Sequence, residues 1–200
     1  MIFVGKFKAL QRVDKTSSVY IFNKMNKKLK LWELDRVSED DFKLQKKFPI
    51  IVVLNDIRSL NNIGAFFRTA DAFNVEKIYL CGITAVPPHR DIQKTALGAT
   101  ETIEWEYRQS IDELIKELKV AGISICSIEQ TEKTTLLNEI DTFTESKFAL
   151  VFGNEVNGVD QKVIDASNYI IEIPQFGTKH SLNVSVCAGV VIWEFAKKFI

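Results

Sequence analysis

A chain of 200 residues with 46% hydrophobic side chains can bury a full core, so a globular fold is expected. The 26 basic and 26 acidic side chains cancel, which argues against a uniformly basic nucleic-acid-binding surface. The three cysteines are scattered through apolar runs, no apolar run is long enough to span a bilayer, and the first residues carry charge too early for a signal peptide. We therefore expect a cytoplasmic protein without disulfides, a metal site or a membrane segment.

The first part of the chain differs from the rest in charge. Residues 1–47 carry 12 Lys and Arg against 6 Asp and Glu, whereas the remainder carries 14 basic and 20 acidic side chains. We interpret residues 1–47 as a basic N-terminal arm and residues 48–200 as one domain. Such an arm fits contact with nucleic acid, and a solvated basic tail explains the charge equally well. Ser38, followed by three acidic residues, indicates the start of a helix.

From about Phe48 onward, apolar runs with strand character alternate with helical patterns. Several runs are apolar at consecutive positions, as expected for strands that helices cover on both faces. The alternation predicts an α/β fold with a mostly parallel sheet and helices on both faces. The predicted strands are Ile50–Leu54, Lys77–Cys81, Glu101–Trp105, Ser124–Ile128, Phe148–Phe152 and Tyr169–Ile173.

Apolar residues at helical spacing predict helices between these strands. One starts near Ile63 and ends at Asn74, and another starts near Ile111 and ends at Gly122, since both end residues tolerate left-handed backbone. The last predicted helix, roughly Ser181–Phe199, is apolar on almost every side. At the end of a small domain such a helix usually needs a second subunit to cover it, so we expect a homodimer. An N-terminal element of the same chain is the alternative cover.

Three polar patches interrupt the apolar pattern, and each follows a predicted strand, where open α/β sheets bind ligands. The first patch, residues 55–64, leads into a helix that contains Arg68. No acidic residue lies one turn before Arg68. This arginine is therefore either functional or paired elsewhere, with Asp71 or Asp56 as the candidates.

The second and third patches flank the last predicted strand. Residues 153–159 place Glu155 among amides and between two glycines, which let the backbone turn tightly and approach a ligand. Residues 173–186 bring Ser181 and Asn183 to the start of a very apolar helix. A helix cap accounts for one such residue only, and backbone donors at this point could hold a ligand carboxylate.

Motifs of several other enzyme classes are missing. The sequence has no dinucleotide-binding glycine motif after the first strand, no P-loop, no nucleophile elbow and no metal-spaced set of His and Cys. His89 and His180 stand alone, without an evident Cys or Ser partner. Hydrolases and nicotinamide-dependent enzymes are therefore disfavoured.

Taken in order, the three patches resemble the three motifs of the SpoU (TrmH-type) branch of the SPOUT RNA methyltransferases. The matching segments are N-N-I-G-A-F-F-R-T-A-D-A-F, V-F-G-N-E-V-N-G-V-D and I-P-Q-F-G-T-K-H-S-L-N-V-S-V. They span Asn62–Val186 in the right order, which makes the resemblance specific. A weaker likeness extends from about Leu29 to the C-terminus and includes Thr95–Thr100, whereas residues 1–28 have no clear counterpart.

The resemblance implies an S-adenosyl-L-methionine-dependent enzyme that methylates a ribose 2'-hydroxyl of tRNA or rRNA. It also implies a homodimer with composite sites and a C-terminal trefoil knot, which is rare among folds. Its catalytic positions fall on Asn62, Arg68, Glu155, Ser181 and Asn183. Its cofactor-binding positions fall on Phe152, Gly153, Asn154, Gly158, Ile173, Pro174, Ser181, Leu182 and Asn183.

Within this resemblance Arg68 engages the target ribose or its phosphate, and Glu155 orders the site. Because the guanidinium pKa exceeds about 12, Arg68 suits stabilising a developing alkoxide better than accepting a proton. Two alternatives stay open, namely a non-catalytic RNA-binding or assembly protein of the same fold and a base-methylating SPOUT enzyme. The complete motifs favour an enzyme, and their residues favour ribose as the group that is methylated. Between the two RNA classes, tRNA is slightly preferred as the substrate.

Overall fold

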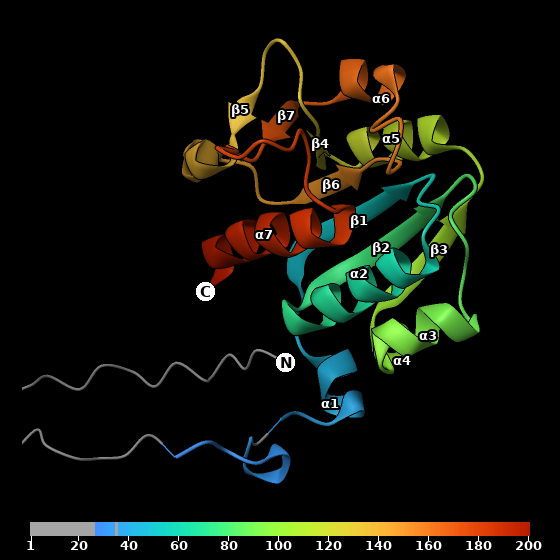
Figure 1. Cartoon of the computed structure of the whole chain (residues 1–200), viewed down its shortest axis with the longest axis vertical. Helices are drawn as coiled ribbons and strands as arrows, with labels where there is room; N and C mark the ends of the chain where they lie inside the picture. The colour runs from blue at the N-terminus through green and yellow to red at the C-terminus, as the bar shows by residue number, and fades with distance from the viewer. Residues whose placement is uncertain (1–26, 35) are drawn as a thin grey trace, which may run out of the picture.

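The computed structural model describes residues 27–34 and 36–200, and in this part all paired strands of a seven-stranded sheet run parallel (Figure 1). The strand order is β3-β2-β1-β6-β4-β7-β5. The predicted α/β fold with a mostly parallel sheet is therefore confirmed. The strands are β1 (Phe48–Asn55), β2 (Val75–Cys81), β3 (Glu104–Arg108), β4 (Ser124–Ile128), β5 (Thr135–Leu136), β6 (Phe148–Phe152) and β7 (Tyr169–Glu172).

The central strands form because both of their faces are apolar. In β1, the side chains of Ile50, Val52 and Leu54 pack in the larger hydrophobic core, whereas those of Ile51 and Val53 pack in the smaller one. Successive strand residues point to opposite faces, so a run of apolar residues fills both cores at once. The sheet therefore separates two apolar cores, each closed by its own layer of helices.

Two layers of helices cover the sheet (Figure 1). Helices α2, α3, α4 and α7 pack on the larger core, and α5 and α6 pack on the smaller one. A Cβ on Gly64 of α2 would lie 2.1 Å from Thr95 Oγ1 and 2.3 Å from the Ile92 carbonyl oxygen, so this glycine lets α3 lie directly on α2. The helices are α1 (Glu39–Leu44), α2 (Leu60–Ala72), α3 (Arg90–Ala96), α4 (Ala99–Thr102), α5 (Ile111–Val120), α6 (Gln161–Ala166) and α7 (Val184–Ala196), with 3-10 helices η1 (Leu31–Glu33), η2 (Leu137–Thr142) and η3 (Lys197–Phe199).

The strand order reverses between β1 and β6, where the chain starts to build outward in the other direction. Helix α2, which follows β1, lies on one face of the sheet, and α6, which follows β6, lies on the other. The loops after these neighbouring strands therefore diverge at the carboxyl edge of the sheet. Ligand sites of open α/β sheets lie at such a point.

Two of the strand predictions match the structure at both ends. The bounds of β4 and β6 are those predicted from the sequence. The prediction is wrong at Glu101–Trp105, because residues Ala99–Thr102 form α4 after Gly98, whose φ is 91°. The strand there starts at Glu104. The two-residue strand β5 was not predicted.

The helix ends follow local backbone chemistry. Asn74 and Gly122 adopt the predicted left-handed conformation after α2 and α5, with φ of 53° and 73°. The last helix starts later than predicted, at Val184 instead of Ser181. Asn183 is its N-cap, so Ser181 lies in the loop before it.

The predicted basic arm falls only partly within the described residues, since residues 1–26 and 35 lie outside them. In the described part, Ser38 Oγ accepts a hydrogen bond from the Asp41 N–H at 3.1 Å and caps α1, as predicted. Phe42 of α1 is buried in the larger core, so the end of the arm packs on the domain. The arm boundary at residue 47 and the trefoil knot stay predictions. No helix among the described residues is long and apolar enough to cross a membrane.

Candidate active site

The loop after β6 is tied to the start of α2 by the carboxylate of Glu155. It accepts hydrogen bonds from the backbone N–H groups of Arg58 and Ser59, each at 3.0 Å, and from Asn62 Nδ2 at 3.0 Å. Partial burial alone would raise the pKa of this carboxyl, but these donors outweigh burial and hold the pKa below its usual value. Glu155 is therefore ionised at neutral pH and joins two loops that lie far apart in the sequence.

A row of side-chain amides continues from Glu155 to the last helix. Asn62 is buried, and its Oδ1 accepts a hydrogen bond from Asn183 Nδ2 at 3.3 Å. Asn183 in turn caps α7, because its Oδ1 accepts from the N–H groups of Ser185 at 3.0 Å and Val186 at 3.4 Å. The loops after β1, β6 and β7 are thus joined by one hydrogen-bonded row.

The turn after β6 brings two stretches of backbone very close together. Asn154 and Gly158 exchange two backbone hydrogen bonds of 2.9 Å, and Asn154 Nδ2 donates to the Asp56 carbonyl at 2.7 Å. Gly158 has a φ of +70°, and a Cβ on Gly153 would lie 2.1 Å from the Gly158 carbonyl carbon. Neither position has room for an ordinary side chain, which explains the two glycines around the acid.

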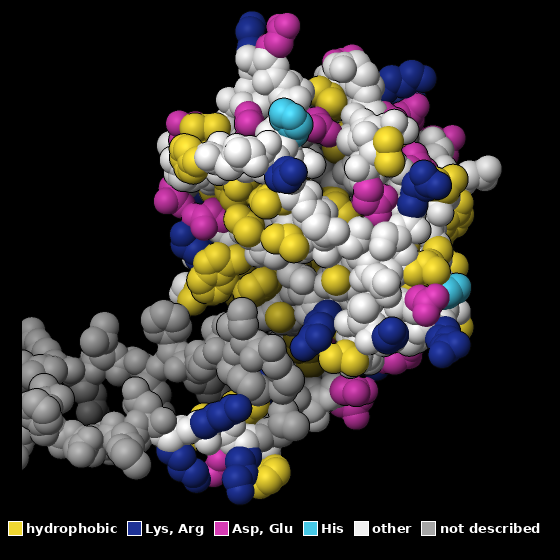
Figure 2. Space-filling model, in the orientation of Figure 1, with side chains coloured by type: hydrophobic (Ala, Val, Ile, Leu, Met, Phe, Trp, Pro, Cys, Tyr) yellow, Lys and Arg dark blue, Asp and Glu magenta, His cyan; other side chains and the backbone are white. Residues whose placement is uncertain are grey.

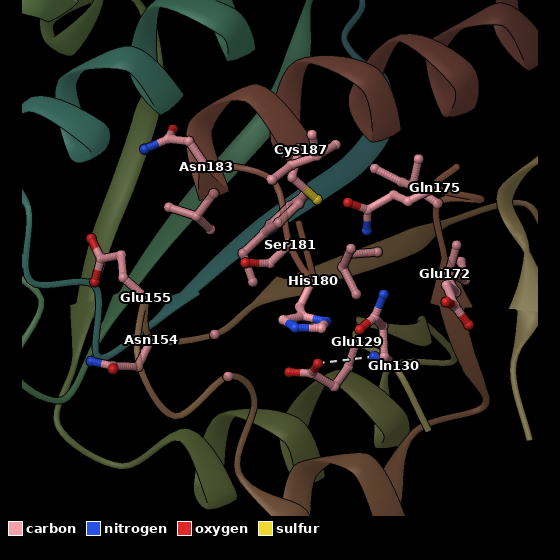
Figure 3. A pocket seen from close by; sticks show the side chains of 18 of the residues that line it. Glu129, Gln130, Asn154, Glu155, Glu172, Gln175, His180, Ser181, Asn183 and Cys187 are labelled. Atoms are coloured by element: carbon pink, nitrogen blue, oxygen red, sulfur yellow. Dashed lines mark hydrogen bonds between the residues drawn. The ribbon is translucent and has the colours of Figure 1, made fainter. Parts of the chain in front are cut away.

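Beside this row lies a pocket of about 460 Å³, formed by the ends of β4, β6 and β7, the loops that follow them and the first turn of α7 (Figure 3). Sites for small molecules typically measure roughly 300–1,000 Å³. All the predicted cofactor-binding residues except Pro174 line it. They are Phe152, Gly153, Asn154, Gly158, Ile173, Ser181, Leu182 and Asn183.

The predicted catalytic residues divide into two groups. Glu155, Ser181 and Asn183 line the pocket, whereas Asn62 and Arg68 do not. Asn62 does not line the pocket itself but forms hydrogen bonds with two residues that do, Glu155 and Asn183. Arg68 lies on the exposed side of α2, six residues further along the same helix.

Arg68 is not held by the acids considered as its partners. Asp71 accepts a hydrogen bond from Thr102 Oγ1 at 2.6 Å, and Asp56 accepts one from the Ile83 N–H at 2.8 Å. Within the described part of the chain Arg68 forms no ion pair. Among the described residues, no carboxylate therefore competes with an external anion for this guanidinium.

The chain also matches a known family. Residues 49–193 match the SpoU rRNA Methylase family. The chain belongs to this family. The resemblance of its three polar patches to the SpoU motifs is thereby confirmed.

Relatives of this SpoU chain carry methyltransferase names. A 23S rRNA (guanosine-2'-O-)-methyltransferase RlmB from Neisseria meningitidis is 31% identical over 146 residues, which cover 73% of this chain and 57% of the relative. An uncharacterized tRNA/rRNA methyltransferase from Borreliella burgdorferi is 29% identical over 77% of this chain and 66% of the relative. The chain thus spans less than two thirds of the length of these relatives.

Solved structures of SpoU-type proteins share the fold. The TrmH/SpoU tRNA modifying enzyme of A. aeolicus superposes with a TM-score of 0.71 at 24% identity, over 80% of this chain and 81% of that one. An AdoMet-bound rRNA methyltransferase from Sinorhizobium meliloti superposes with a TM-score of 0.72 at 22% identity, over 80% and 60%. These likenesses agree with the parallel sheet and its two helical layers.

Several pocket residues of this SpoU chain were not singled out from the sequence. Glu129 follows β4, and its carboxylate accepts from the Val159 N–H and the Gln130 N–H, each at 2.9 Å. Its place after a strand was the only available signal, because a lone acid forms no motif. His180, isolated in the sequence, also lines the pocket. So does Cys187, where burial and the negative charge of Glu129 raise the pKa of the thiol to about 12.

Proposed function

We propose that this SpoU family chain transfers a methyl group from S-adenosyl-L-methionine to a ribose 2'-hydroxyl of tRNA or rRNA. The observation that carries the proposal is that all three motif loops meet beside one pocket, in the row from Glu155 through Asn62 to Asn183. The names of the relatives, which include a 23S rRNA (guanosine-2'-O-)-methyltransferase and a tRNA/rRNA methyltransferase, support RNA as the substrate class. A cytoplasmic location suits the three free thiols.

The pocket suits this cofactor in shape and chemistry. Apolar side chains such as Ile173 and Leu182, which are not buried in the core, can flank an adenine ring, and amide and carboxylate groups can bind the polar parts of ribose and amino acid. The absence of a side chain on Gly153 and Gly158 lets backbone form the wall where a side chain would fill it. The residues proposed to hold the cofactor are Phe152, Gly153, Asn154, Gly158, Ile173, Pro174, Ser181, Leu182 and Asn183.

When bound, S-adenosyl-L-methionine would supply a sulfonium methyl group. Transfer to the ribose oxygen would leave S-adenosylhomocysteine as a neutral thioether, and the hydroxyl proton would pass to solvent. The chain contributes mainly by placing the hydroxyl in line with the methyl group. Glu155, Asn62 and Asn183 fix the loops that define this position. Ser181 adds a hydroxyl to the same wall.

Arg68 is proposed to act on the RNA side of the reaction. It is exposed and carries a planar fork of donors that fits a phosphate or a developing alkoxide. Stabilising negative charge as it develops on the ribose oxygen lowers the barrier more than it strengthens binding. Arg68 is therefore proposed to affect the rate of methyl transfer, whereas the pocket residues are proposed to affect the affinity for the cofactor.

We also propose that α7 joins two copies of the chain. Val186, Val190 and Trp193 form one exposed stripe, the α7 stripe, and are 55%, 41% and 38% exposed. Figure 2 displays hydrophobic side chains gathered over α7. Such a patch on an otherwise buried helix is typical of an interface, and two-fold symmetry would cover one stripe with another.

The reaction is tested by incubating the chain with labelled S-adenosyl-L-methionine and unmodified tRNA or, separately, unmodified rRNA. Nucleosides are then analysed. The expected result is a 2'-O-methylnucleoside from one pool, with tRNA slightly preferred. A methylated base would instead place the chain among base-methylating enzymes. No incorporation together with no cofactor binding would favour a non-catalytic RNA-binding protein.

A further inference from the structure

The pocket is lined by acids and by no strong base. Among its described lining residues, Glu129, Glu155 and Glu172 are acidic, and none is Lys or Arg. Among these lining residues, His180 is the one with a basic side chain. An enclosed wall of one sign concentrates a field that favours ligands of opposite charge.

The three carboxylates are engaged in different ways. Glu155 is turned toward the start of α2 and receives three hydrogen bonds there. Glu172 Oε2 accepts a hydrogen bond from Thr134 Oγ1 at 3.0 Å, on the side of the short strand β5. Glu129 accepts only two backbone hydrogen bonds, one on each oxygen. Each of its oxygens keeps a lone pair that no described donor uses.

Glu129 is also held where its charge reaches across the pocket. Its Oε2 is bound to the Val159 N–H, and a Cβ on Gly158 would lie only 2.1 Å from that oxygen, so the turn after β6 closes directly on the carboxylate. On the opposite wall, the negative charge of Glu129 adds to burial in raising the pKa of the Cys187 thiol on α7. Figure 3 shows Glu129 and His180 pointing into the space between these walls.

We infer that Glu129 determines which charge state of the ligand the pocket prefers, selecting the positively charged methyl donor over its neutral product. This inference rests on the proposed function. S-Adenosylmethionine carries one positive charge more than S-adenosylhomocysteine, because methyl transfer converts a sulfonium to a thioether. A carboxylate that stabilises the sulfonium form more than the thioether form favours exchange of spent product for fresh donor.

The size of the preference follows from Coulomb's law. Two opposite unit charges roughly 8 Å apart, in surroundings of effective dielectric about 40, change a binding constant by about fivefold. A contact that reads the ribose diol would behave differently, because donor and product carry the same diol. The ratio of the two dissociation constants therefore isolates the effect of charge.

The test compares dissociation constants for S-adenosylmethionine and S-adenosylhomocysteine, measured by calorimetry on the full chain. In Glu129→Gln, which keeps the size of the side chain but not its charge, the preference for the donor should fall about fivefold, mainly through weaker donor binding. Glu129→Asp keeps the charge and should keep the preference, even where the shorter side chain weakens both ligands. Glu113→Gln, which removes an exposed charge on α5, should leave both constants unchanged.

The outcomes are distinguishable. If Glu129→Gln weakens donor and product equally, or leaves their ratio at the wild-type value, Glu129 is a loop anchor and the inference is overturned. If the wild-type chain binds both ligands but transfers no methyl group, the function proposal fails while the charge preference still stands or falls on the ratio. Binding of neither ligand by the wild-type chain overturns both.

Discussion

The two layers of helices that cover the sheet differ in the side chains that they expose to solvent. On the α5/α6 side, α5 buries one apolar stripe and exposes charged residues such as Asp112 and Lys116. On the α2/α7 side, α7 is apolar on almost every side, and Val190 and Trp193 stay exposed. A charged outer face is stable in water, whereas an apolar one gains free energy only when it is covered. The comparison supports the proposal that a second copy of the chain covers the exposed side chains of α7.

The largest expected effect comes from placing a charge on the α7 stripe. Val190→Glu should weaken self-association about a thousandfold or more, because a two-fold interface would bury the new carboxylate twice, face to face. Sedimentation velocity over a range of concentrations measures the change. Lys116→Glu on α5 introduces the same residue on the solvated layer and should leave the assembly unaltered. An unchanged sedimentation profile for Val190→Glu would remove the basis for the α7 dimer.

A substitution of Arg68 tests whether the α2 side also contributes to methyl transfer. Arg68→Lys keeps the charge but loses the planar fork, so methyl transfer should fall about a hundredfold, while the affinity for S-adenosylmethionine stays within about twofold. Labelled methyl transfer and calorimetry measure the two quantities. The matched control is Arg108→Lys at the end of β3, where the arginine pairs with Glu106 and Glu117 on the surface. Full turnover in Arg68→Lys would rule out the stabilising role.

A smaller effect is expected at the junction of the α2 and β6 loops. Glu155→Gln replaces one acceptor oxygen by an NH₂ group that faces backbone donors, so the free energy of unfolding should fall by about 1 kcal/mol at this partly solvated site. Chemical denaturation measures it. Asp165→Asn on α6, which alters an exposed hydrogen bond from Gln161, should change stability by less than about 0.5 kcal/mol. If Glu155→Gln and Asp165→Asn lower the free energy of unfolding equally, the Glu155 carboxylate has no special role in stability.

The smallest expected effect is the pH dependence of the stability difference between wild type and Glu155→Gln. The folded-state pKa of Glu155 lies below the ordinary value of 4.5, so its contribution to stability is fully present above that pH and is lost as the pH falls through the lowered pKa. The gap in unfolding free energy between wild type and Glu155→Gln should therefore be constant near neutrality and shrink in acid. A gap that stays constant down to about pH 3 would show that ionisation is not involved.

The parts of this molecule that could be predicted from sequence are those set by local pattern. β6 is apolar at all of its positions and β4 at Ile125, Cys126 and Ile128, while Asn74 and Gly122 adopt the left-handed backbone that their residue types favour. Helix α4 and strand β5 are too short for any period to emerge. The strand predicted at Glu101–Trp105 failed for that reason.

The site divides in the same way. The motif resemblance named Glu155, Asn62 and Asn183, but their contacts join residues 93 and 121 positions apart, which no local pattern encodes. Glu129 was missed because its partner, the Val159 N–H, lies 30 positions away and is a backbone group. The residue types of the site could be predicted, whereas their hydrogen-bonded order required the fold.

Asn183 has a consequence beyond its own hydrogen bonds. One side chain caps the helix that carries the α7 stripe and also holds Asn62, which supports Glu155. The helix proposed for assembly and the residues of the site are therefore connected through a single amide. If copies associate through α7, turnover per chain should rise with the concentration of the protein itself, so the cell could set its methylation rate by abundance more steeply than in simple proportion.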